Sequence, residues 1–189
     1  IDIEDEGTIA AAAEAVGATG PLHLVFVATG LLHDDTLHPE KTWRDMTPEG
    51  FARAFAVNAT GPALVAKHFL PLVPRREAAI FAAISARVGS VSDNRAGGWY
   101  GYRASKAALN QILRCLAIEE GRRRPQLVIA GLQPGTVATP LSEPFRSAVP
   151  AGELLDPETS ASALLGVLAG LTPRQSGRLF DWQGEPFEP

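Results

Sequence analysis

Three continuous apolar runs recur along this chain, and a segment with helical periodicity separates each run from the next. The runs cover residues 23–28, 78–85 and 126–132, and a shorter strand is expected at residues 178–182. Strands that are apolar on both faces are typical of parallel sheets, because helices cover both faces of such a sheet. The alternation therefore predicts an α/β fold built on a doubly wound parallel sheet.

Local signals predict where the helices of this fold begin. Residues of the type that caps helices precede three of the helical segments, at Asp5, Thr47 and Asp156. The segment after Thr47 extends to about residue 70, and Gly61 and Pro62 interrupt it. Because proline lacks a backbone N–H, we expect a kink there and a backbone carbonyl left free.

Charge and residue composition argue against several classes of protein. The net charge of −4 arises from 17 basic and 21 acidic residues without a long run of either sign, which is unlike a nucleic-acid-binding surface. No apolar run is long enough to cross a membrane and no signal peptide is visible, so we expect a cytoplasmic protein. The four histidines lack metal-ligand spacing, so no metal site is expected. The single cysteine, Cys115, is interpreted as a small core residue.

Tyr102 and Lys106 open an amphipathic helix at about residues 101–121 and lie one turn apart on the same face. The apolar stripe of this helix consists of Leu109, Ile112, Leu113, Leu116 and Ala117. A phenol beside an ammonium group can donate and accept a proton. The positive charge is expected to lower the pKa of Tyr102 from its ordinary value of about 10 towards neutrality. The alternative interpretation is an exposed tyrosine and lysine that share helical spacing by chance.

Several short motifs follow one another in a characteristic order. They are Asp2 at an expected strand end, Ala28-Thr29-Gly30 after a strand, Asn58-Ala59 in the kinked helix, Ile84-Ser85 at a strand end, Tyr102-Arg103-Ala104-Ser105-Lys106 at a helix start, and Pro134-Gly135-Thr136-Val137-Ala138-Thr139 after a strand. This order resembles the short-chain dehydrogenase/reductase family, which has a Rossmann-like fold. Residues 171–177 and 181–184 are similar to its C-factor-like and sniffer-like carbonyl reductase branch.

The resemblance implies an oxidoreductase that interconverts a carbonyl and an alcohol by hydride transfer with NAD or NADP. Tyr102 would be the general acid/base, and Lys106 would lower the pKa of Tyr102 and hold the ribose hydroxyls of the cofactor. Asn58 would hold a water that links Lys106 to solvent. The cofactor-binding residues implied are Asp2, Ile3, Ala28, Gly30, Tyr102, Lys106, Pro134, Gly135, Val137 and Thr139.

Simpler interpretations of three of these positions remain open. Asn58 can also be interpreted as a helix-surface amide, and Asp2 as a helix cap near Asp5. Pro134 and Gly135 are also compatible with an ordinary turn.

One departure from the family pattern lies at the start of the chain. Residues 1–3 are interpreted as the end of a strand, and no glycine-rich phosphate-binding turn precedes or follows them. We therefore expect an N-terminally truncated fold, in which residues 1–189 form a single partial Rossmann-like domain without the first two strands and helices. Such a sheet would expose an apolar edge.

A second departure concerns the serine that the family uses to hydrogen-bond the substrate oxygen. Ala86 occupies that position, and Ser85 is expected to point to the opposite face of the strand. Ser90 and Ser92 are candidate replacements. The alternative function is a non-catalytic cofactor-binding or signalling protein on the same scaffold.

The partner expected from the resemblance is a small-molecule carbonyl or alcohol, with no nucleic acid and no membrane. The helices at residues 48–70 and 101–121 resemble those that form dimer contacts in the family, which implies a homodimer. The substrate remains open, because it depends on the loops at residues 31–46, 87–98 and 138–155. The choice between NAD and NADP also remains open, because the segment that determines it in the family is not among residues 1–189.

Overall fold

The computed structural model describes residues 1–150 and 152–189. In this part of the chain the main sheet has the strand order β1-β2-β3-β6-β7. Neighbouring strands from β1 to β6 are parallel, whereas β7 is antiparallel to β6. The strands are β1 (Leu24–Val27), β2 (Ala79–Ile84), β3 (Leu127–Gln133), β6 (Arg178–Asp181) and β7 (Pro186–Phe187). The apolar runs of the sequence therefore do form the parallel strands of the sheet.

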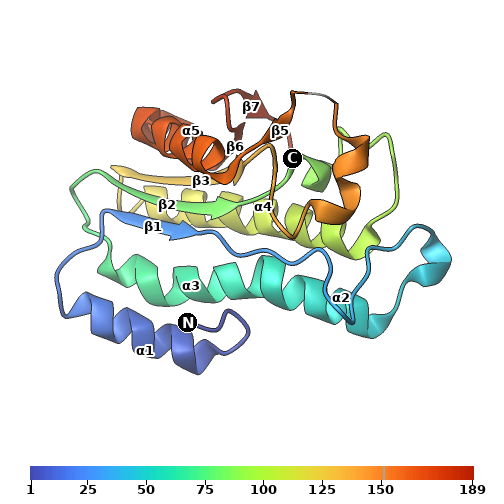
Figure 1. The fold of residues 1–189 in the computed structure, drawn as a ribbon. Coiled ribbons are helices and arrows are strands. Elements are labelled where there is room, and N and C mark those ends of the chain that lie inside the picture. Colours follow the sequence, from blue (N-terminus) through green and yellow to red (C-terminus); the bar gives the residue numbers. More distant parts are fainter. Residues whose placement is uncertain (151) are drawn as a thin grey trace.

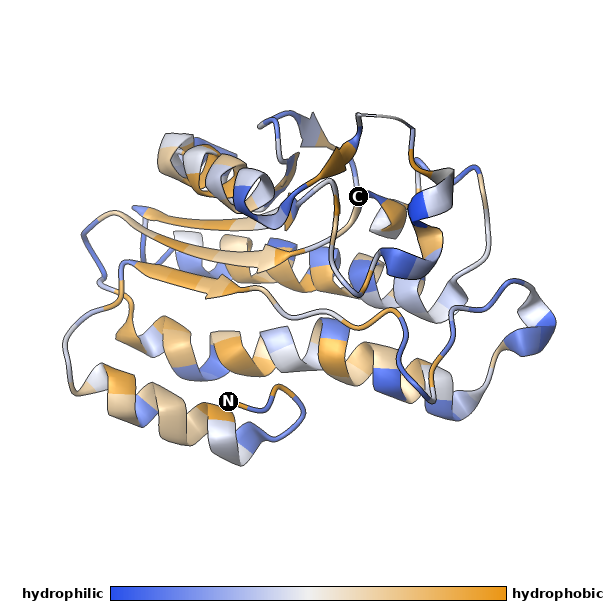
Figure 2. Cartoon of the chain, viewed as in Figure 1, coloured by the Kyte–Doolittle hydropathy of each residue, from blue (hydrophilic) through white to orange (hydrophobic). Residues whose placement is uncertain are grey.

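Helices cover both faces of this sheet. They are α1 (Glu6–Gly17), α2 (Pro48–Phe55), α3 (Gly61–Phe69), α4 (Tyr100–Gly121) and α5 (Pro157–Gly170). Figure 1 shows α3 and α4 on one face, with α1 outside α3, and α5 on the opposite face. One apolar core joins the sheet to α1, α3 and α4, and a second joins it to α5. Figure 2 shows that the strands are mainly hydrophobic, whereas the helices carry a mixture of hydrophobic and hydrophilic residues. The predicted doubly wound α/β fold is confirmed.

The helix predicted after Thr47 is interrupted as expected. It consists of α2, a π-helical turn η2 (Ala56–Thr60) and α3. The Gly61 N–H donates to the carbonyl of Ala56, five residues earlier, instead of four. Pro62 supplies no N–H for the carbonyl of Asn58, which lies four residues before it. The kink is therefore a π turn that changes the register of the helix next to Asn58.

The N-terminal residues differ from the prediction. Residues 1–3 form no strand. The backbone instead turns back, with the Asp5 N–H bonded to the Asp2 carbonyl at 3.2 Å and the Asp2 N–H bonded to Thr8 Oγ1 at 2.9 Å. These local bonds satisfy the backbone of Asp2 without a neighbouring strand. β1 lies at the edge of the sheet, where Leu24 is 45% exposed, so the expected apolar edge is present.

Short elements connect the helices and strands. A second, two-stranded sheet pairs β4 (Thr136–Val137) with β5 (Leu154–Leu155). The 3₁₀ turns are η1 (Trp43–Asp45), η3 (Leu70–Leu72), η4 (Arg87–Gly89), η5 (Glu143–Ala148) and η6 (Pro173–Gln175). Elements of this length have too few residues to show a periodic pattern.

The predicted apolar stripe of α4 is confirmed, but the placement of Cys115 is wrong. Leu109, Leu113 and Ala117 are buried against the sheet, whereas Cys115 is exposed. Cys115 lies two residues after Leu113, which is about 200° around the helix, and so it faces away from the core. In the described part of the chain, no helix combines the length and apolar character needed to cross a bilayer.

Candidate active site

Most of the site residues predicted from the sequence lie at one end of the sheet. Ala28 and Gly30 follow β1, Ala86 follows β2, and residues 134–139 follow β3. Carboxyl ends of parallel strands lie at the same edge of a sheet, and ligands of doubly wound folds bind there. The first turns of α4 carry Tyr102 and Lys106, and the Lys106 side chain reaches this edge at Ile84, the last residue of β2.

Lys106 has a buried ammonium group. The residue is 1% exposed, and its Nζ donates a hydrogen bond to the carbonyl of Ile84, at the end of β2, at 2.8 Å. None of the ion pairs between described residues includes Lys106. Burial lowers the pKa of Lys106 to about 8. Because an ammonium group has three N–H donors, this side chain can hold acceptors beyond Ile84.

The prediction that the pKa of Tyr102 is lowered towards neutrality is wrong. Burial instead raises the pKa of Tyr102 to about 12. The Lys106 Nζ lies 5.8 Å from the centre of the Tyr102 ring. At that separation the attraction of one cation does not offset the loss of water around the phenolate. The phenol is therefore protonated at neutral pH.

Asn58 connects the loop after β1 to the start of α4. Its side chain is 0% exposed, which excludes the surface interpretation. Asn58 Oδ1 accepts from the Leu31 N–H at 2.8 Å, and Nδ2 donates to the Leu31 carbonyl at 2.7 Å and to Ser105 Oγ at 3.1 Å. The Ser105 hydroxyl in turn donates to the Tyr102 carbonyl at 2.8 Å. The amide is thus occupied by protein groups, and only the backbone carbonyl of Asn58, which has no Pro62 N–H opposite it, is suited to hold a water.

Gly30 gives a ligand direct access to this polar cluster. Gly30 is exposed, and a Cβ built there would lie 3.6 Å from Lys106 Nζ and 3.8 Å from Asn58 Oδ1. Ala28, two residues earlier, is also exposed. A small residue beside a buried ammonium with spare donors fits the ribose hydroxyls of a nicotinamide cofactor. The structure therefore brings Gly30, Asn58 and Lys106 together.

Asp2 and Ile3 lie apart from this cluster. The Asp2 carboxylate accepts from the Glu4 N–H at 2.9 Å, which is a local turn and not the cap of α1. That cap is Asp5, as predicted, because its side chain accepts from the Gly7 N–H. Ile3 packs on Gly61, where an added Cβ would lie 2.3 Å from Ile3 Cγ1. Ile3 therefore contacts the start of α3, close to the π turn that carries Asn58.

Residues 134–139 form a wall at the end of β3. The Pro134 carbonyl accepts from the Ser160 hydroxyl of α5 at 2.7 Å, and Gly135 packs against Leu155 and Trp182. Val137 pairs with Leu155 in the small sheet. The Thr139 carbonyl accepts from Arg146 Nη2 at 2.8 Å. This segment is more than a turn, because α5, β5 and η5 all hold it.

The serines near the family's catalytic serine position point elsewhere. Ser85 is 1% exposed and its hydroxyl donates to Asn110 Oδ1, in line with the predicted opposite orientation. The Ser90 and Ser92 hydroxyls lie 3.2 Å apart. Both line a hollow of about 320 Å³ beside Arg87 and β7. The cavity beside Tyr102 does not include them.

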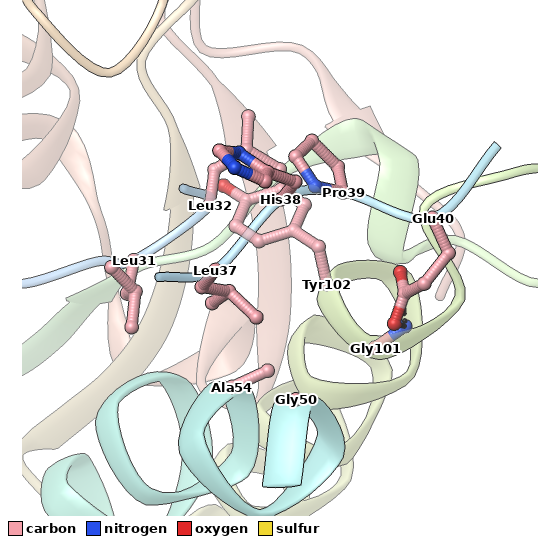
Figure 3. Close-up of a pocket in the computed structure, with 10 residues that line it drawn as sticks. All are labelled: Leu31, Leu32, Leu37, His38, Pro39, Glu40, Gly50, Ala54, Gly101 and Tyr102. Carbon is pink, nitrogen blue, oxygen red and sulfur yellow. Dashed lines mark hydrogen bonds between the residues drawn. The ribbon is translucent and has the colours of Figure 1, made fainter. Parts of the chain in front are cut away.

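That cavity has a volume of about 10 Å³, which is room for one water molecule. Figure 3 shows Tyr102 and His38 along it, with the Glu40 carboxylate at the backbone of Gly101. The lining residues are Leu31, Leu32, Leu37, His38, Pro39, Glu40, Gly50, Ala54, Gly101 and Tyr102. No local sequence pattern indicates that Glu40 belongs to the site, because Gly101, its partner, lies 61 residues away.

An aromatic cluster that was not predicted covers the first turn of α4. The Trp99 ring packs edge-on to Tyr102, with ring centres 6.4 Å apart, and lies 4.8 Å from the Phe145 ring. His33 meets Phe145 at 5.9 Å, and its Nε2 lies 3.1 Å from the Leu141 carbonyl. These contacts connect the segment around η5 to the loop after β1, next to Tyr102.

Comparison with known proteins identifies relatives of this chain. A family described as "Enoyl-(Acyl carrier protein) reductase" matches residues 1–170. C-signal of Myxococcus xanthus is 37% identical over 141 residues, which cover 74% of this chain and 79% of that protein. The 1-hydroxy-2-glutathionyl-2-methyl-3-butene dehydrogenase of Rhodococcus sp. (strain AD45) is 30% identical over 181 residues, covering 94% of this chain and 74% of the relative.

A solved structure shows the same fold. NADPH-bound carbonyl reductase from chicken fatty liver superimposes with a TM-score of 0.85 at 24% identity, covering 100% of this chain and 75% of that chain. In the described residues, no three His, Cys, Asp or Glu side chains are arranged to hold a metal ion. The family match, the fold and the order of motifs agree. The chain belongs to the short-chain dehydrogenase/reductase family of NAD(P)-dependent oxidoreductases.

Proposed function

We propose that this protein interconverts a carbonyl and an alcohol, with Tyr102 as the general acid/base. The observation that carries the proposal is the pairing of a half-buried phenol with the buried ammonium of Lys106, one turn apart at the carboxyl end of the sheet. The exposed Gly30 lies beside that ammonium. The site therefore combines a phenol that can donate a proton with an adjacent ammonium group that can bind a polar group of a ligand.

Tyr102 has the protonation state that carbonyl reduction needs. Its pKa of about 12 keeps the proton on the phenol oxygen, from which it is donated to the substrate oxygen. When bound, the nicotinamide cofactor supplies or accepts the hydride. Lys106 would hold the ribose hydroxyls and stabilise the phenolate left after the proton leaves. Ala28, Gly30 and residues 134–139 would form the surrounding cofactor surface, with Asp2 and Ile3 at its adenine end.

The proton must be replaced after each turnover. We place the replacing water at the backbone carbonyl of Asn58, which faces no proline N–H in the π turn. The Asn58 amide holds Leu31 and Ser105, so it keeps this carbonyl and Tyr102 in a fixed relation. Ala86 supplies no hydrogen bond to the substrate oxygen. A missing donor of this kind costs roughly 10²-fold in rate, so a slow enzyme is expected.

The direct test is cofactor oxidation by the full-length protein over a panel of aldehydes and ketones. Tyr102→Phe should abolish turnover, whereas Tyr100→Phe is the matched control because it removes a phenol two residues away on the same helix. Equal activity of the wild-type protein and Tyr102→Phe would refute the role of Tyr102.

Ala86 favours a second candidate, a cofactor-binding protein without catalysis that acts in signalling. The relative named C-signal is in line with this alternative. Full-length protein would then bind NADPH, measured by its fluorescence, and oxidise none of the panel. The signalling effect of the protein would then persist in the Tyr102→Phe variant.

Three further features remain proposals. Residues 1–189 would form a single partial Rossmann-like domain, and two copies would pair through the helices at residues 48–70 and 101–121. Light scattering of the purified protein tests the dimer. A cytoplasmic location is tested by cell fractionation.

A further inference from the structure

Glu40 is a buried carboxylate at the N-terminus of α4, next to the proposed proton donor. The residue is 7% exposed, and its two carboxylate oxygens accept from the Gly101 N–H at 3.2 and 3.1 Å. The Glu40 carbonyl accepts from the Trp99 N–H at 2.6 Å. One residue of the loop between β1 and α2 thus binds two backbone groups at the start of the helix, where N–H groups lack partners within the helix.

The contact between Glu40 and α4 depends on a glycine. A Cβ built on Gly101 would lie 2.9 Å from Glu40 Oε1 and 3.6 Å from the Ala54 Cβ of α2. A larger residue would displace the carboxylate from the helix end. Trp99, the residue before the helix, has a φ of 53°, a left-handed conformation that is costly for a tryptophan. The bond from Trp99 to the Glu40 carbonyl helps to hold that conformation.

The counter-charge of Glu40 is the helix end itself. None of the ion pairs between the described residues includes Glu40. The N-terminus of a long helix carries partial positive charge, which stabilises a carboxylate there. That same partial charge would favour the phenolate of Tyr102, so the negative charge of Glu40 cancels part of it.

We infer that Glu40 is a positioning residue for Tyr102, which fixes the first turn of α4 and opposes ionisation of the phenol through its negative charge. This inference rests on the proposed role of Tyr102. The other titratable group lining the shared cavity is His38, and the facing residues of α2 are Gly50 and Ala54. On α4 itself, Lys106 lies beside the Tyr102 ring.

The test compares Glu40→Ala and Glu40→Gln with Glu49→Gln, a matched control in the exposed first turn of α2. Glu40→Ala removes the acceptor for Gly101, and kcat should fall on the order of 10- to 100-fold because the acid is misplaced. Glu40→Gln keeps one acceptor and should retain kcat within about threefold. The KM for the cofactor should change less than about twofold in both variants, since Gly30 and Lys106 are untouched.

The pH dependence separates the charge of Glu40 from its structural role. Glu40→Gln should lower the apparent pKa of Tyr102 by up to about one unit, because it removes a negative charge from the N-terminus of the helix whose first turn carries Tyr102. The chain has two tyrosines, Tyr100 and Tyr102, so ¹³C NMR of labelled tyrosine reads this titration without turnover. Tyr102→Phe assigns the two signals.

The outcomes separate this inference from the proposed function. If Tyr102→Phe retains activity, the proposed function fails whatever Glu40 does. If Tyr102→Phe is inactive but Glu40→Ala has unchanged kcat, or Glu40→Gln leaves both the pH profile and the tyrosine titration unchanged, the inference alone is overturned. If Glu40→Ala does not fold, the pH profile of kcat and the tyrosine titration of Glu40→Gln decide whether the inference holds.

Discussion

Replacing Asn58 with alanine should destabilise the protein far more than the same change at Asn110, although both side chains are buried in helices. Asn58 is 0% exposed and makes three hydrogen bonds, two of them to the backbone of Leu31. Asn110 is 4% exposed, and its Oδ1 accepts from Ser85 while its Nδ2 has no partner among the described residues. The two substitutions remove the same atoms from environments that differ in hydrogen bonding.

The magnitude follows from the groups left behind. Asn58→Ala leaves the N–H and the carbonyl of Leu31 without partners, at about 1 kcal/mol each for a half-buried group, and adds a small cavity. We expect a loss of about 2–3 kcal/mol in the free energy of unfolding. Asn110→Ala leaves one serine hydroxyl unpaired but removes an unpaired amide, for a net change of about 0–1 kcal/mol.

Urea unfolding of both variants, followed by the fluorescence of the three tryptophans, measures this difference. A gap of about 2 kcal/mol corresponds to roughly 4–8 °C in Tm for a chain of this size. Equal destabilisation of the two variants would show that the bonds from Asn58 to Leu31 do not hold the loop after β1.

Three further predictions concern the pH dependence of stability and the rate of the reaction. Burial lowers the pKa of Lys106 to about 8 from 10.5, so between these pH values the unfolded chain keeps a proton that the folded protein has released. The wild-type protein should therefore gain stability relative to Lys106→Met as pH rises from about 8 to 10, and a constant difference in urea unfolding would contradict this. Pro62→Ala restores an N–H that can occupy the Asn58 carbonyl in place of the water, so kcat should fall about tenfold with no loss of stability. An unchanged kcat would exclude the proton route through that carbonyl. Ala86→Ser should raise kcat/KM for carbonyl reduction by up to about 100-fold, and no gain would mean that another group already donates to the substrate oxygen.

Features that depend on neighbouring residues could be predicted from the sequence. Asp5, Thr47 and Asp156 each accept a backbone N–H at a helix start, because a cap needs only the next few residues. The kink before Pro62 could be predicted for the same reason, since proline removes a specific N–H, whereas its form as the π turn Ala56–Thr60 could not. The main strands were found because burial on both faces leaves a continuous apolar run.

Features set by distant contacts could not be predicted. Glu40 accepts a hydrogen bond from Gly101, which lies 61 residues away, and no local sequence pattern indicates that these two residues are in contact. The pKa of Tyr102 was predicted in the wrong direction, because helical spacing gives the position of Lys106 but not the extent of burial. The prediction for Cys115 was wrong because it rested on closeness in sequence to the apolar stripe of α4. The rotation of about 200° between Leu113 and Cys115 around the helix places Cys115 on the exposed side.

The position of Tyr102 is set less by α4 than by the elements around it. The Ser105 hydroxyl donates to the Tyr102 carbonyl and accepts from the Asn58 amide, which connects the first turn of α4 to η2 and, through Leu31, to the loop after β1. Lys106 connects the next turn to the end of β2 through Ile84, and Glu40 holds the helix start at Gly101. Each connection buries a polar or charged group that water would otherwise solvate. This burial costs desolvation free energy that an apolar contact would not. A fold under selection for stability alone has no need of three such groups within two turns, whereas a phenol that must transfer a proton at a fixed point does.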